Sequence, residues 1–72
     1  MKVFVNATEI NIFTGAKAQD AVFSYFRSMQ TITPEPFPII FDQFGNTIEP
    51  DGELSESNQL FTVSSNNIVN YE

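Results

Sequence analysis

Two short segments near the N-terminus alternate apolar with polar residues. Their apolar positions are Val3, Val5, Ile10 and Ile12. A period of two is typical of strands that bury one face, and the short link at residues 6–8 makes the two segments a predicted hairpin. Asn6 tolerates the left-handed backbone of a tight turn, whereas Ala7 does so only at a cost. We therefore expect a link slightly longer than a two-residue primed turn.

The apolar spacing changes to intervals of three and four residues after Gly15. The positions that recur in this way are Ala18, Ala21, Val22, Tyr25, Phe26 and Met29. They predict one apolar face of a helix of about three to four turns. Asp20 and Arg27 complement the helix dipole at its two ends. Phe23 lies off this face, so it either contacts the loop that follows the helix or is exposed.

Prolines determine where this helix ends. Residues 33–38 include three prolines, which fix φ and lack a backbone donor, so the helix must stop before Pro34 and the chain continues as a stiff, extended crossover. A strong β-forming run follows at residues 39–41 and ends at a turn around Gly45. Residues 47–49 are expected to pair back briefly.

The last predicted strand covers residues 59–63, and Leu54 before it is a candidate for a buried plug. Beyond this strand, residues 64–72 are either a tail or an additional edge strand. The order along the chain is therefore hairpin, helix, crossover, strand, turns and strand. This order predicts an α+β fold, in which a mixed sheet wraps around a single helix.

Composition indicates how the core is built and which chemistry is available. Residues 1–72 are expected to form a single domain, and they include eight Phe, two Tyr, no Cys and no His. A domain of this size has a thin core, and because each aromatic ring buries on the order of 150–250 Å², we expect the core to be rich in Phe. The lack of Cys and His removes disulfides, the usual transition-metal ligands and the commonest general base. We therefore expect neither an enzyme nor a bound cofactor.

Net charge narrows the class of partner. Three basic residues stand against nine acidic ones, which gives a net charge of −6 at pH 7 and opposes binding to nucleic acid or to anionic membranes. No apolar run is long enough to span a membrane, and the N-terminus lacks the pattern of a signal peptide. These features favour a soluble, cytoplasmic protein.

An acidic segment is the candidate for a metal site. Its members are Asp42, Glu49, Asp51, Glu53 and Glu56. Carboxylate oxygens are ligands of hard cations such as calcium, but the spacing of these residues does not match an EF-hand loop. Solvated turn residues that keep a small protein soluble are the better interpretation, so we assign no metal ligand.

Two stretches of the chain resemble the small sulfur-carrier (ThiS/MoaD) family, which includes the thiamine-pathway carrier and the small subunit of molybdopterin synthase. Residues 5–22 have that family's polar turn, alternating strand, Gly-containing link and helix with Asp20 followed by apolar residues. Residues 51–60 are similar to its late turn, in which Leu54 precedes a polar loop and the last strand. Residues 1–5 have the pattern of the first strand of ubiquitin. The resemblance implies a β-grasp (ubiquitin-like) domain, with a four- to five-stranded mixed sheet in ββαββ order.

The C-terminus departs from the family pattern. Sulfur carriers and ubiquitin act through a flexible tail ending in Gly-Gly, because only residues without a side chain pass the channel in which the terminal carboxylate is adenylated. This chain ends in Asn70-Tyr71-Glu72 and contains no Gly-Gly. We therefore expect a non-enzymatic protein–protein interaction module. A sulfur-carrier-like protein or subunit in cofactor biosynthesis is the alternative.

The outward face of the predicted sheet is the candidate partner site. If the alternating Val and Ile residues point to the helix, then Phe4, Phe61 and Val63 point away from it. A β-grasp sheet places the first and last strands side by side, which brings Phe4 and Phe61 into one apolar patch, and such patches usually mark contact sites. We expect a protein partner or self-association through this face or through an exposed strand edge. In the competing interpretation, Ile68, Val69 and Tyr71 fold back over the patch, or the helix side of the sheet takes one of the Phe residues.

Overall fold

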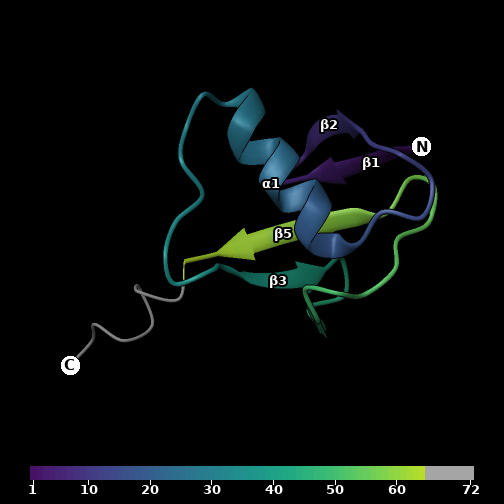
Figure 1. Ribbon diagram of the computed structural model, residues 1–72. Helices are drawn as coiled ribbons and strands as arrows, with labels where there is room; N and C mark the ends of the chain where they lie inside the picture. The colour runs from purple at the N-terminus through teal and green to yellow at the C-terminus, as the bar shows by residue number, and fades with distance from the viewer. Residues whose placement is uncertain (65–72) are drawn as a thin grey trace.

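The N-terminal alternation forms a β-hairpin in the structure, a computed structural model that describes residues 1–64 (Figure 1). Its strands are β1 (Lys2–Val5) and β2 (Thr8–Asn11), which pair antiparallel. The apolar positions that were predicted to face the helix are buried on both strands, as the period of two requires. The hairpin is therefore confirmed, with its apolar face toward the core.

The turn of this hairpin consists of only two residues, Asn6 and Ala7, with φ of 51° and 67°. The longer link expected from the sequence is wrong because Val5 pairs directly with Thr8, and the twist of a two-residue primed turn matches that of the strands. The Asn6 amide nitrogen donates to Thr62 Oγ1 at 2.9 Å, and its amide oxygen accepts the Thr62 N–H at 3.0 Å. The left-handed backbone conformation costs a residue with a Cβ roughly 1–2 kcal/mol. Ala7 has no polar side chain whose hydrogen bonds could offset this cost.

Helix α1 (Ala18–Ser28) lies where the three- and four-residue spacing predicts it. The Asp20 carboxylate accepts the Lys17 N–H at 3.0 Å and so caps the first turn. The fully buried side chains of the helix are Ala18, Ala21 and Val22. Met29 lies beyond the last helical residue and is 46% exposed, so it does not belong to the buried face. Among residues 1–64, no helix has the length and apolar character that crossing a bilayer requires.

Three further strands complete a mixed sheet: β3 (Ile39–Asp42), β4 (Thr47–Ile48) and β5 (Gln59–Val63). The strand order is β2-β1-β5-β3-β4, and only the β1–β5 pair is parallel. Figure 1 shows α1 lying across one side of this sheet. The described part of the chain is therefore α+β, with five strands and one helix. The brief pairing expected at residues 47–49 is confirmed as β4.

The pairing of β1 with β5 forms the centre of the sheet. Val5 is aligned with Leu60, and both side chains are buried. The backbone N–H of Phe4 donates to the backbone carbonyl of Asn58, and that of Asn6 donates to the backbone carbonyl of Leu60, each at 2.8 Å. Strands from the two ends of the described chain therefore lie side by side.

Aliphatic side chains, not aromatic rings, form the buried core. Its members are Val3, Val5, Ile10, Ile12, Ala16, Ala18, Ala21, Val22, Ile40 and Leu60. The expected Phe-rich core is wrong for the described residues, because the Ala side chains of α1 allow a close approach to the sheet and leave a layer too thin for rings at its centre. Phe26 and Phe37 are half-buried and pack at its margins. Leu54 also packs there, half-buried, where a plug was expected.

One carboxylate organises the turn between β3 and β4. Asp42 Oδ1 accepts the backbone N–H of Asn46 at 2.9 Å and that of Phe44 at 2.8 Å. Gly45, with φ of 85°, donates to the Asp42 carbonyl at 3.1 Å. The backbone donors, Asn46 foremost, favour the ionised carboxylate and hold the pKa of Asp42 below its ordinary value, against an opposing effect of desolvation. The turn predicted around Gly45 is thus confirmed.

Replacing Ala7 with Gly is expected to raise the free energy of unfolding by about 0.5–1 kcal/mol, because Gly adopts a positive φ without a Cβ clash but loses more freedom on folding. Denaturant unfolding followed by circular dichroism measures the change. Ala18→Gly is the matched control, and at its helical position the same replacement should lower the stability. An Ala7→Gly variant of equal or lower stability would contradict the cost assigned to this turn.

Asp42→Asn is expected to weaken the dependence of stability on pH. Because the pKa of Asp42 is lower in the folded than in the unfolded chain, its carboxylate stabilises the fold above the unfolded-state pKa, and this contribution is lost as the pH falls through the folded-state pKa. The stability difference between the parent and Asp42→Asn should therefore be largest near neutral pH and shrink below about pH 4.

Unfolding curves recorded from neutral to acidic pH measure this difference. Asp51→Asn removes one charge outside the Asp42 network and corrects for the change in net charge. If the difference in the free energy of unfolding between the parent and Asp42→Asn stays constant over the whole pH range, the hydrogen bonds of Asp42 do not distinguish its ionised from its protonated carboxyl group.

Candidate functional site

The face of the sheet turned away from α1 carries a set of apolar side chains. They occupy the strand positions that alternate with buried ones, and alternation sends them to the opposite face. We call this set the outer-face patch, and it consists of Phe4, Ile39, Phe41, Phe61 and Val63. All described strands belong to the sheet and the one described helix lies on its other side. No helix or strand of residues 1–64 therefore covers the patch.

Cross-strand pairing makes the patch continuous. Phe41 of β3 lies directly opposite Phe61 of β5. Ile39 lies opposite Val63 on the same two strands. Phe4, on the other side of β5, is a diagonal neighbour of Phe61. Phe61 and Val63 remain 37% and 39% exposed, whereas the other three members are half-buried.

Two side chains of opposite charge flank the patch on its β1–β2 side. Lys2 shares the face, with its Nζ 6.0 Å from the centre of the Phe4 ring, a contact worth on the order of 0.5–1 kcal/mol at an exposed site. Glu9 of β2 lies opposite Phe4. On the far side, Thr47 of β4 lies opposite Phe41 and carries no charge. The charges of Lys2 and Glu9 cancel, whereas the chain carries −6 overall.

The structure brings together the three partner residues predicted from the sequence, Phe4, Phe61 and Val63, and their role in binding stays a prediction. Sequence reasoning missed Ile39 and Phe41, which belong to the same face. They stand in an uninterrupted apolar run, so no alternation shows which side chains point outward. The proximity of Phe41 to Phe61 also depends on the pairing of two strands that are distant in sequence.

Two predictions fall outside the described residues. One is the folding back of residues 68–71 over the outer-face patch. The other is the assignment of residues 64–72 as a tail or an edge strand, of which the structure describes Ser64 alone. The sulfur-carrier alternative depends on the same C-terminal residues.

The sheet also has two open edges, at β2 and β4. β4 is two residues long, so β2 is the longer edge. Met1 and Ile12 exchange two backbone hydrogen bonds of 2.8 Å. Because hydrogen-bonded and non-hydrogen-bonded pairs alternate along an antiparallel ladder, the backbone N–H and C=O groups of Glu9 and Asn11 point away from β1. Such groups can accept a partner strand, while the charge of Glu9 disfavours pairing with a second copy.

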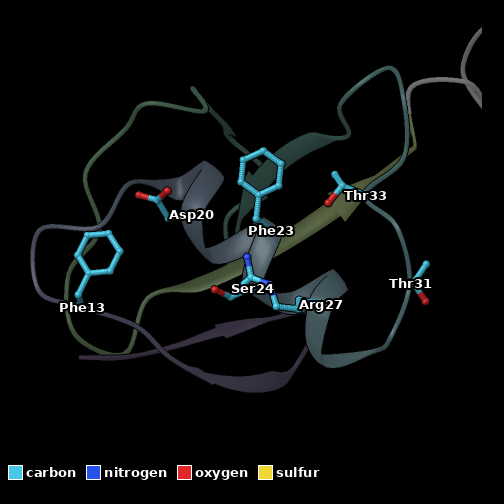
Figure 2. Close-up of a pocket in the computed structure, with 7 residues that line it drawn as sticks. All are labelled: Phe13, Asp20, Phe23, Ser24, Arg27, Thr31 and Thr33. Carbon is cyan, nitrogen blue, oxygen red and sulfur yellow. The ribbon is translucent and has the colours of Figure 1, made fainter.

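A groove runs along the solvent-facing side of α1. Its larger hollow has a volume of about 400 Å³. That hollow is lined by Phe13, Asp20, Phe23, Ser24, Arg27, Thr31 and Thr33 (Figure 2). A hollow of about 250 Å³ adjoins it, shares Phe23 and Thr33, and is closed by residues 34–37 of the crossover. We call the two hollows together the helix-side groove.

Sequence reasoning did not identify the helix-side groove, because its walls come from a loop, a helix and a crossover that no periodic pattern relates. The one signal was Phe23, which lies off the apolar face of the helix. Its ring makes an edge-to-face contact with Phe37, with 5.4 Å between the ring centres. Both alternatives given for Phe23 therefore hold, because the ring contacts the segment after the helix and is also 41% exposed.

The acidic segment does not gather into a metal site, since no three acidic side chains of the described residues lie close enough to hold an ion. Asp42 serves the β3–β4 turn. The Glu56 carboxylate accepts the Lys2 N–H, with 3.3 Å to each of its oxygens. Glu53 forms an isolated β-bridge with Lys17. These contacts join turns to strands and to the start of α1.

No family model, curated protein or solved structure matches this chain. The likeness to the sulfur carriers therefore stays a resemblance of the residue patterns described above. Any assignment of function has to come from the surfaces themselves.

Proposed function

We propose that the chain is a non-enzymatic interaction module of the β-grasp type, which binds another protein through its outer-face patch. The β-grasp assignment is supported by the sheet order, in which the first and last strands are parallel neighbours at the centre. It is also supported by the sequence of elements along the chain, with a hairpin followed by one helix, a crossover and the remaining strands.

The observation that carries the functional proposal is an aromatic sheet face that no helix or strand of residues 1–64 covers. Sheets with only one side packed usually turn a polar face to water, yet here Phe4, Phe41 and Phe61 occupy outward positions on three neighbouring strands. Burying such a surface against a partner is favourable by about 25 cal/mol per Å² of apolar area. Clustered aromatic side chains are also among those that dominate binding energies at interfaces.

The charge distribution indicates the kind of partner. The chain carries −6, while the charges beside the outer-face patch are the opposed Lys2 and Glu9. A partner with an apolar surface surrounded by basic groups would therefore meet no repulsion at the patch and would be attracted by the rest of the molecule. A second copy of the chain would instead bring like net charges together, so we favour a different, basic protein over self-association.

The double variant Phe4→Ser, Phe61→Ser is expected to lose most of the binding of protein partners, because it removes the central rings of the patch. Capture of proteins from a cell extract by the immobilised chain measures partner binding, and sedimentation equilibrium measures self-association. Phe44→Ser is the matched control, since Phe44 is 78% exposed in the β3–β4 turn, away from the patch. It should bind as the parent does.

Thermal unfolding of each variant shows whether the fold survives. If the double variant does not unfold cooperatively, Phe61→Lys replaces it, because this position is exposed and tolerates a long polar side chain. Partner binding by a folded variant at the parent level would exclude the outer-face patch and leave the two open edges of the sheet, of which β2 is the longer, for binding.

A further inference from the structure

Arg27 provides a cation in the helix-side groove that has no partner of opposite charge among residues 1–64. Its side chain is exposed, and no carboxylate of residues 1–64 forms an ion pair with it. Figure 2 shows the side chain beside Ser24, and both residues line the larger hollow. Arg is the residue best suited to hold a carboxylate by two parallel hydrogen bonds. The groove therefore contains a free anion-binding group.

Asp20 is the acidic residue that lines the same hollow. It stands seven positions before Arg27, which is about 10 Å along a helix axis, close to one screening length at physiological ionic strength. One of its oxygens already accepts the Lys17 N–H at 3.0 Å. Asp20 therefore repels a singly charged anion bound at Arg27 only weakly. It would repel a more highly charged anion more strongly.

The remaining walls of the groove combine hydroxyl groups with aromatic rings. Ser24 and Thr33 offer hydroxyl donors in the hollow that Arg27 lines, whereas the Thr31 hydroxyl already donates to the Met29 carbonyl at 3.1 Å. Phe13 and Phe23 are 63% and 41% exposed, and both rings border the hollow. This combination fits an anionic group that is attached to an apolar one.

The second hollow extends the site beyond a single anchoring point. It continues from Phe23 and Thr33 to residues 34–37, where Phe37 and the prolines present apolar surface. A joined pair of hollows suits an extended chain that places its end in one hollow and a side chain in the other. A compact small molecule would occupy only the larger hollow.

We propose that the helix-side groove binds the C-terminal carboxylate of an extended peptide whose last residues are apolar. The carboxylate is held by Arg27 with the help of the neighbouring hydroxyl groups, and a preceding apolar side chain packs on Phe23 and Phe37. A monoanion is selected over a phosphate because the groove offers one Arg, includes Asp20, and belongs to a chain of net charge −6. This site is separate from the outer-face patch and does not depend on its function.

The test is an NMR titration of the isotope-labelled chain with an acetylated peptide that ends in leucine and phenylalanine. The free-carboxylate form should shift the backbone amide signals of Ser24, Arg27 and Thr33. Amidation of the peptide terminus should weaken binding by about tenfold or more, and Arg27→Gln should do the same, because each removes the charged pair. Arg27→Lys keeps the charge and should restore part of the affinity.

Lys17→Gln is the matched control, because it removes the same charge from a residue that does not line the groove, and it should leave the affinity unchanged. The outer-face double variant should also bind the peptide as the parent does, which separates failure of this site from failure of the proposed function. Equal binding of the free and amidated peptides, or an unaffected Arg27→Gln variant, would overturn the proposal. So would equally tight binding of 3-phenylpropionate or phenyl phosphate.

Discussion

The close contact of α1 with β1 and β2 is the interaction on which the rest of the structure depends. Ala18 and Ala21 place almost no bulk between helix and sheet, and they share one buried core with the aliphatic side chains of both strands. A chain of this size without Cys has no disulfide to supplement its core. The thin aliphatic layer therefore has to provide most of the stabilising burial, and there is no room in it for large rings.

The exclusion of rings from the core explains why this small protein has two distinct candidate surfaces. Phe4, Phe41 and Phe61 lie on the far side of the sheet, and Phe13 and Phe23 border the groove beside α1. The two sets differ in their polar surroundings. The sheet face is suited to a broad apolar contact, whereas the groove contains Arg27 and three hydroxyl groups, which suits a ligand with a charged end.

Features that depend on neighbouring residues could be predicted from the sequence, and features that depend on pairing could not. The period of two gave the hairpin strands, the wider spacing gave α1, and Gly45 marked the β3–β4 turn. The two-residue turn at Asn6 and Ala7 was missed because it follows from the register of the strands, and local preference argued against Ala7. The place of Phe41 on the outer face and the helix-side groove both require the sheet order and the path of the crossover, which no local pattern contains.

The central position of β1 and β5 has a consequence for how the molecule is made. Because these two strands come from opposite ends of the described chain, closing the sheet requires a contact that is very distant in sequence, and such topologies fold more slowly than those built from local contacts. During synthesis the residues of β1 emerge well before those of β5, and until β5 pairs with it the inner edge of β1 has no partner strand. A chain truncated before Gln59 would therefore keep an open strand edge in place of the centre of the sheet, which favours aggregation.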